Sequence, residues 1–191
     1  MKILIGGGGT GGHIYPALAL ARYALAEDDS SEILFVGSAS GLESKIVPSA
    51  GFPLMIIPAR GFQRSFKQLG LVIWDLVRGL VQSGKIISEY QPNVVLGTGG
   101  YVAAPLVIAA LLRRLPVVIH EQNALPGLTN RWLAPFVKRV CLSFAETEKR
   151  MFGSSRIVFT GNPRASEVMN LSRAEGCRFF GFDPLQKNIL I

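Results

Sequence analysis

The chain has 191 residues, of which 49% are hydrophobic and 17% charged, and its formal net charge is +7. This composition predicts a folded domain with a sizeable core and excludes an intrinsically disordered chain. The positive charge favours an anionic partner, which can be nucleic acid, a membrane surface or a phosphorylated ligand. Two cysteines without metal-ligand spacing indicate reduced thiols in a cytosolic protein, and the longest uncharged apolar stretch, residues 101–112, is too short to span a bilayer.

Short aliphatic runs alternate with longer helical patterns along the chain. The predicted strands cover residues 2–5, 33–36, 54–57, 94–96, 117–120, 139–142 and 157–160. The predicted helices cover residues 14–27, 41–50, 68–90, 103–113, 128–134 and 145–152. Continuous apolar strands that alternate with helices are typical of parallel βαβ units. We therefore expect an α/β fold with a doubly wound, Rossmann-like parallel sheet.

The end of the chain departs from this pattern. A polar, helix-like segment covers residues 166–180, and residues 187–191 resemble the start of a further strand. We expect a Rossmann-like domain over residues 1–163 and an interdomain linker with a helix over residues 164–186. Residues 187–191 are then expected to be the first strand of a second domain that has been cut away.

Two glycine-rich loops share one design. Residues 9–13 read GTGGH and residues 97–101 read GTGGY, and each loop follows a predicted strand and precedes a proline and an apolar helix. Bare backbone N–H groups in front of a helix dipole form a site for phosphate or pyrophosphate. Two such loops at the carboxyl edge of one sheet favour a ligand site over tight turns that serve packing alone.

A dinucleotide-binding domain is an alternative, because G-x-G-x-x-G occurs from Gly6 and again from Gly7. That fingerprint also needs an acid after the second strand, to hold the ribose hydroxyls. The second predicted strand runs instead into the uncharged residues 37–41, and Glu43 lies inside the next helical pattern. No G-x-x-x-x-G-K-[ST] motif occurs, which excludes a P-loop NTPase.

The two histidines both stand beside predicted strand ends. His13 follows the first glycine loop, where an imidazole can donate to phosphate or act as a general base. His120 begins the polar run HEQN at residues 120–123. Strand alternation sends Glu121 and Asn123 to one side and His120 and Gln122 to the other. A carboxylate and an amide in one crevice suit a sugar or a peptide backbone.

Four motifs in order resemble one enzyme family. The segments GGGGTGGHIYPALALA, GTGGYVAAP, HEQNALPGLTNRWLA and TGNPRA are similar to those of MurG, the UDP-N-acetylglucosamine:undecaprenyl-pyrophosphoryl-MurNAc-pentapeptide N-acetylglucosaminyltransferase family. The resemblance implies the N-terminal, acceptor-binding half of an inverting GT-B glycosyltransferase, which moves GlcNAc from UDP-GlcNAc to the C4 hydroxyl of MurNAc in lipid I. It implies no metal or other cofactor, and a fragment that is inactive without its donor-binding half.

The resemblance also implies roles for individual residues. His13 is the base for the acceptor hydroxyl, and Glu121 is the competing candidate. The residues that contact the donor are Thr10, Gly11, Gly12, Asn123 and, more weakly, Arg164, which stands one place earlier than in some members. The residues that handle the acceptor are Gly8, Gly9, Gly97, Thr98, Gly99, Gly100 and Tyr101, together with Glu121.

A lipid-linked acceptor must be collected from a bilayer. The predicted helix 68–90 carries a broad apolar stripe that includes Ile73, Leu76 and Val77. Leu71 and Trp74 fall outside this stripe and beside Arg78 and Lys85, so we predict a patch that meets anionic lipid. The expected location is peripheral, on the cytoplasmic face of the cell membrane. A core helix with a solvated basic face is the alternative. Recognisable nucleic-acid modules are absent from the sequence, and two other functions stay open: a binding-only nucleotide module and a membrane adaptor without enzymatic ancestry.

Overall fold

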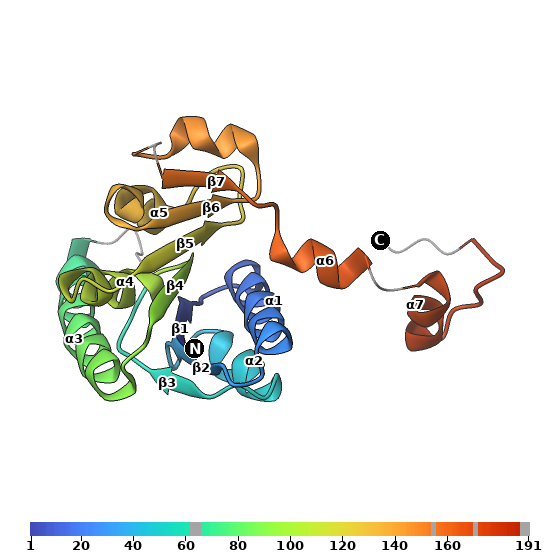
Figure 1. Cartoon of the computed structure of the whole chain (residues 1–191), viewed down its shortest axis with the longest axis horizontal. Coiled ribbons are helices and arrows are strands. Elements are labelled where there is room, and N and C mark those ends of the chain that lie inside the picture. Colours follow the sequence, from blue (N-terminus) through green and yellow to red (C-terminus); the bar gives the residue numbers. More distant parts are fainter. Residues whose placement is uncertain (62–65, 154–155, 170–171, 188–191) are drawn as a thin grey trace.

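The computed structural model describes residues 1–61, 66–153, 156–169 and 172–187 (Figure 1). Within these residues seven strands form one parallel sheet in the order β3-β2-β1-β4-β5-β6-β7. The strands are β1 Lys2–Gly7, β2 Glu32–Gly37, β3 Leu54–Ile56, β4 Val94–Gly99, β5 Val117–Glu121, β6 Arg139–Leu142 and β7 Ile157–Phe159. The predicted α/β class and the seven predicted strands are confirmed.

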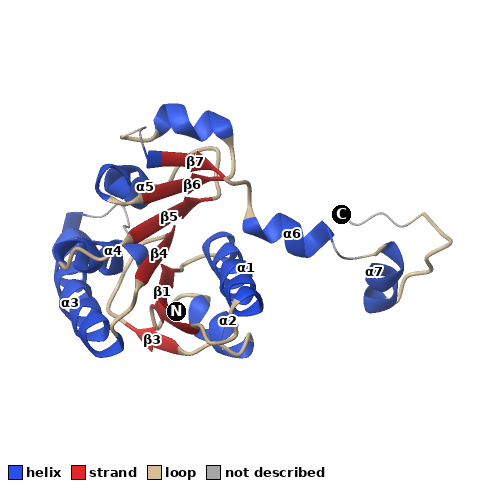
Figure 2. Ribbon diagram, in the orientation of Figure 1, coloured by secondary structure: helices blue, strands red, loops and turns tan. Residues whose placement is uncertain are grey.

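Helices cover both faces of the sheet (Figure 2). The α-helices are α1 Gly11–Glu27, α2 Glu43–Ser49, α3 Phe66–Tyr90, α4 Ala103–Leu112, α5 Leu128–Leu133, α6 Pro163–Met169 and α7 Arg173–Phe180. The described residues also include the 3₁₀ helices η1 Ala134–Phe136 and η2 Ala145–Arg150. The six helices predicted before residue 153 are present, although the last of them is a 3₁₀ helix.

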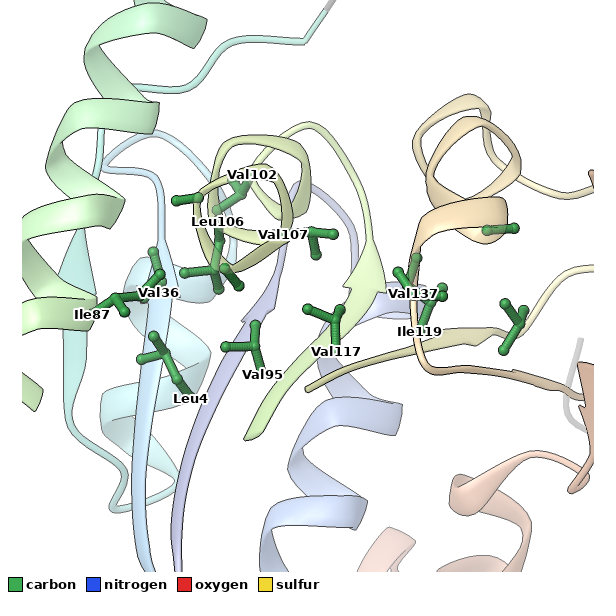
Figure 3. Close-up of a cluster of buried hydrophobic side chains, with 14 of the residues drawn as sticks. Leu4, Val36, Ile87, Val95, Val102, Leu106, Val107, Val117, Ile119 and Val137 are labelled. Atoms are coloured by element: carbon green, nitrogen blue, oxygen red, sulfur yellow. The ribbon is translucent and has the colours of Figure 1, made fainter. Parts of the chain in front are cut away.

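Strand alternation divides the apolar side chains between two cores. Ile3 and Ile5 of β1 pack with α1 and α2, whereas Leu4 joins the core beneath α3, α4 and α5. Figure 3 shows this second core, in which Val95 and Leu106 lie among the labelled side chains. Both faces of the central strands are therefore buried, which explains why these strands read as continuous apolar runs.

The strand order reverses between β1 and β4. From β1 the chain proceeds outward through β2 and β3, and it then returns to place β4 on the other side of β1. Such a reversal opens a crevice at the carboxyl ends of the two strands, which is where ligands bind in open α/β sheets. Both glycine loops emerge there, because residues 9–13 follow β1 and residues 97–101 end β4 and enter α4.

The amino-terminal half of α3 differs from the expected amphipathic helix. Ile73, Leu76 and Val77 belong to the predicted apolar stripe, yet all three are exposed. Ile86 and Ile87 in the carboxyl-terminal half of the helix join the core. The exposed apolar surface is therefore larger than the sequence predicts. In the described part of the chain, no helix combines the length and the apolarity needed to cross a membrane.

The predicted segment 166–180 forms two helices instead of one. α6 begins at Pro163 and packs against α1, where Arg22 donates to Glu167 over 2.9 Å. α7 follows at the far end of the molecule (Figure 1). The division into residues 1–163, 164–186 and 187–191 stays a prediction, and residues 188–191 lie outside the described part.

Candidate functional site

The two glycine loops contact each other directly. Gly100 has φ of +82°, and a β-carbon there would lie 2.2 Å from the carbonyl oxygen of Gly8. Gly9 has φ of +87°, and its β-carbon would lie 2.9 Å from the ring of Tyr101. Side chains larger than hydrogen would therefore separate the loops. From the sequence, we expect glycine at these positions because a ligand must approach the backbone closely. The structure shows a second reason, which is that the two loops pack directly against each other.

Two of the predicted cradle glycines face the protein interior. Gly97 is a buried residue of β4, and a β-carbon there would lie 3.0 Å from Val107 of α4. A β-carbon on Gly8 would overlap the carboxyl group of Glu43 at 2.4 Å. The more accessible part of the first loop is the start of α1, where Thr10 and Gly12 are exposed and no side chain caps the helix. The backbone N–H groups of Gly11 and Gly12 precede the first bond of the helix, which His13 N donates to Thr10 O over 3.1 Å.

His13 in the first turn of α1 is bound to the second loop. The carbonyl oxygen of Thr98 lies 2.9 Å from Nδ1 of His13, and the hydroxyl of Thr98 donates to the carbonyl oxygen of His13 over 2.8 Å. Thr98 itself is fully buried. The amide nitrogen of Gln122 lies 2.5 Å from the same Nδ1 atom. The first turn of α1, strand β4 and the loop after β5 thus meet around one imidazole ring.

Glu43 holds the first glycine loop from beneath. The side chain is fully buried, and its carboxyl group accepts from Gly9 N at 2.9 Å and from the backbone N–H and the hydroxyl of Ser38, each at 2.8 Å. The Ser38 hydroxyl lies 3.3 Å from the hydroxyl of Tyr101. This acid follows β2, the position of the ribose-binding acid in dinucleotide folds, but its oxygens are occupied by protein donors. The sequence correctly places Glu43 in a helix, of which it is the first residue, but it does not show that the carboxyl group binds the glycine loop.

Glu121 organises the loop after β5. Oε1 accepts from the backbone N–H and the side-chain amide of Asn123 at 3.0 and 3.1 Å. Oε2 accepts from Gly127 N at 3.0 Å and from the Asn130 amide at 2.9 Å. The carboxyl group is 1% exposed. Strand alternation correctly predicts Glu121 beside Asn123, but the carboxyl group has no free oxygen lone pair with which to serve as a base in this arrangement.

His120 lies on the opposite side of β5, beside Ser143 and Gly161, whose hydroxyl and carbonyl oxygens are 3.4 and 3.3 Å from Nε2. Burial lowers the pKa of His120, although the Gly161 carbonyl and the Glu121 charge act in the other direction. The ring lines a groove of about 700 Å³ between α1 and α6. His120 is thus a buried neutral histidine outside the meeting point of the two glycine loops.

Arg164 reaches the start of α1 through an aromatic ring. Its guanidinium lies 4.9 Å from the centroid of the Tyr15 ring, and a β-carbon on Gly11 would lie 3.2 Å from that ring. Arg164 also donates to Glu167. Burial raises the pKa of Glu167, but the bonds from Arg22 and Arg164 outweigh it and hold the pKa below its ordinary value. Arg164 is thus near Gly11 but engaged with protein partners.

The predicted membrane residues are exposed. Leu71 and Trp74 are 50% and 59% exposed, and Arg78 and Lys85 also face solvent. The neighbouring exposed residues Ile73, Leu76, Val77 and Val81 extend this apolar surface of α3. Among the described residues, no group of three or more His, Cys, Asp or Glu side chains is placed to hold a metal ion.

Residues 3–142 match the model of the glycosyltransferase family 28 N-terminal domain. The chain belongs to this family. The match spans β1 to β6 and therefore contains both glycine loops and the loop after β5.

Relatives of this family 28 domain share one name. The UDP-N-acetylglucosamine--N-acetylmuramyl-(pentapeptide) pyrophosphoryl-undecaprenol N-acetylglucosamine transferase of Halalkalibacterium halodurans is 46% identical over 100% of the chain and 53% of its own length. The enzyme of the same name from Pediococcus pentosaceus is 44% identical over 100% of the chain and 52% of its own length. The chain thus spans about half the length of the curated relatives it matches.

Several solved structures share the fold of this chain. The crystal structure of Acinetobacter baumannii MurG is 28% identical, with a TM-score of 0.71 over 84% of this chain and 46% of that one. A UDP-GlcNAc 2-epimerase from Neisseria meningitidis has a TM-score of 0.66 over 95% of this chain and 52% of that one. At 15% identity the epimerase shows the fold alone. The GT-B half-fold predicted from the sequence is confirmed by the MurG match.

Proposed function

We propose that this chain is the acceptor-binding half of an inverting N-acetylglucosaminyltransferase of peptidoglycan synthesis. The whole enzyme moves GlcNAc from UDP-GlcNAc to the C4 hydroxyl of MurNAc in lipid I. The observation that carries the proposal is the placement of His13 between two glycine loops at the reversal point of the sheet. The names of the relatives that cover the whole chain support the same reaction.

In the proposed reaction Nε2 of His13 accepts the proton of the acceptor hydroxyl. The hydroxyl oxygen then attacks the anomeric carbon of GlcNAc, the bond to the UDP oxygen breaks, and the configuration at that carbon inverts. The saturated hydrogen bonding of Glu121 favours His13 over Glu121 as the base. A positioned base contributes about 10²–10⁴-fold to a rate.

The proposed acceptor surface joins the two loops. The start of α1 provides uncapped backbone N–H groups for a pyrophosphate, and the Tyr101 ring closes the space above Gly9. Thr10, Gly11, Gly12, Asn123 and Arg164 are the proposed donor contacts of this half. The occupied oxygens of Glu43 argue against a nucleotide-binding module that uses a ribose acid.

We further propose that α3 rests on the cytoplasmic surface of the membrane. Leu71 and Trp74 are exposed next to Arg78 and Lys85, and such a surface combines apolar insertion with attraction to anionic lipid. A lipid-linked acceptor then reaches the glycine loops from the bilayer.

Binding and turnover test the proposal separately. We expect a water-soluble, short-chain lipid I analogue to bind the chain in titration calorimetry, and Gly99→Val to abolish the heat. In the full-length enzyme we expect His13→Ala to lower kcat by about 10²–10⁴-fold. His120→Ala is the matched control, because that ring lies outside the loops. Tight binding of NAD or free UDP without any binding of the analogue would contradict the proposal.

A further inference from the structure

The His13 ring has two partners on one nitrogen atom. Nδ1 lies 2.9 Å from the carbonyl oxygen of Thr98 and 2.5 Å from the side-chain nitrogen of Gln122. A carbonyl oxygen only accepts hydrogen bonds, so the Thr98 contact requires a proton on Nδ1. An amide N–H group cannot donate to a nitrogen that already carries that proton. The two contacts are compatible only when Gln122 presents its amide oxygen to Nδ1.

An amide is nearly symmetric in shape, and its hydrogen-bond partners decide which end is oxygen. With Oε1 of Gln122 toward the ring, the proton on Nδ1 is shared between two acceptors, Thr98 O and Gln122 Oε1. Gln122 is 7% exposed, and its position after β5 is fixed by the hydrogen bonds that Glu121 accepts from the next turn of the chain. The amide is therefore held against the imidazole, and little water can compete with it for the hydrogen bond to the ring.

We propose that Gln122 and the Thr98 carbonyl are positioning residues that fix His13 as its Nδ1–H tautomer. This inference rests on the proposed function, in which His13 is the base. Nε2 then keeps its lone pair, since the hydrogen bonds that this half-buried ring makes to described residues are both on Nδ1. An orienting acceptor on one imidazole nitrogen leaves the other nitrogen ready to take a proton.

The groups around the His13 ring explain why the neutral amide of Gln122 suits the position beside Nδ1. Gly99 of β4 lies against the ring, and Asn130 of α5 lies beside Gly99, because a β-carbon on Gly99 would be 3.0 Å from Nδ1 of His13 and 3.2 Å from the Asn130 amide. Neither group is charged. Glu121 accepts from Asn130 and makes no hydrogen bond to the ring within the described residues. The proton on Nδ1 is thus fixed by neutral acceptors, which orient the ring without adding charge beside the pyrophosphate.

The tautomer can be observed directly, because the chain contains only two histidines. We would record long-range ¹H–¹⁵N spectra of the ring nitrogens in the labelled 191-residue chain, above the pH at which both rings are neutral. We expect His13 to show a protonated Nδ1 and a bare Nε2, and Gln122→Met to shift His13 toward a mixture of tautomers. The His120 signals serve as the internal reference. A protonated Nε2 on His13 in the unaltered chain would overturn the proposal.

The pH profile of the full-length enzyme provides the second test. Gln122→Glu places a carboxylate on Nδ1, which favours the charged imidazole. We expect the acid limb of kcat/KM to move to higher pH, whereas Gln122→Met lowers kcat roughly 10-fold or more at unchanged KM. A Gln122→Glu profile identical to that of the unaltered enzyme would refute the positioning role. The correct tautomer in an enzyme that transfers no GlcNAc would refute the proposed function and leave the positioning role intact.

Discussion

Gly100 and Gly8 lie so close that no side chain fits between their loops. A β-carbon on Gly100 would be 2.2 Å from the carbonyl oxygen of Gly8, and the φ of Gly100 is +82°. The two loops therefore form one continuous surface at the carboxyl ends of β1 and β4. Position 100 therefore requires glycine for two reasons: a β-carbon would overlap Gly8, and the backbone is in the left-handed region.

We expect Gly100→Ala to lower the free energy of unfolding by at least about 3 kcal/mol. About 1–2 kcal/mol comes from the left-handed backbone, and the remainder from the overlap with Gly8. Gly161→Ala is the matched control, because Gly161 has φ of +75° but no atom within 4 Å of its β-carbon. Urea denaturation of both variants separates the two terms. Equal losses would show that overlap between the loops contributes nothing.

Loss of the Glu43 carboxyl group should also lower the free energy of unfolding. In Glu43→Gln the single amide oxygen cannot serve both Gly9 and Ser38, so a buried donor loses its acceptor. We expect a loss of about 1–3 kcal/mol in the free energy of unfolding. In the full-length enzyme we expect a higher KM for the acceptor, since Gly9 is released. Exposed Glu148→Gln should change neither quantity, and a Glu43→Gln variant of full stability would show that the network is dispensable.

The stability of the chain should fall in two pH windows. The pKa of His120 lies below its ordinary 6.5 in the folded state, so the unfolded chain takes up this proton first and stability declines as the pH falls below 6.5. The pKa of Glu167 lies below its ordinary 4.5, so the stability from its pairing declines only below pH 4.5. His120→Gln should remove the first decline and Glu167→Gln reduce the second in denaturation curves. Persistence of the first decline in His120→Gln would assign it to another group.

Membrane contact through α3 can be measured with vesicles. We expect the chain to sediment with vesicles containing phosphatidylglycerol, and the Leu71→Ser/Trp74→Ser variant to bind roughly 10-fold more weakly or worse, because each lost side chain contributes apolar burial. Arg78→Gln should weaken binding about 5-fold, and added salt should abolish that difference. Tyr23→Ser removes a 64% exposed aromatic ring on α1 and is the control. Equal weakening by Tyr23→Ser would contradict a specific role for α3.

Local patterns in the sequence predict the framework of this fold. Apolar runs such as residues 117–120 identify buried strands, and the GTGGH and GTGGY motifs identify the loops at the reversal point. Both signals are carried by neighbouring residues. The same reasoning also predicts that Glu121 and Asn123 share one side of β5, because alternation along a strand is local.

Contacts between distant segments are not predictable in this way. Thr98 and His13 are 85 positions apart, and Gly9 and Glu43 are 34 apart. No periodicity links such pairs, so the sequence does not reveal that Thr98 binds His13 or that Glu43, the first residue of α2, binds Gly9. The exposure of Ile73 on α3 was missed for a related reason, since helical periodicity shows that an apolar face exists but not whether another element covers it.

The fit between the two loops also determines how they can respond to a ligand. Gly9, Gly99 and Gly100 have adopted their left-handed conformations, and neighbouring atoms fill the space beside each of them. Such loops have few alternative conformations to lose, so the binding of a ligand between them costs little conformational entropy. We therefore expect selectivity to come from a preformed shape, because a ligand of different geometry would force these glycines out of the conformations that they hold.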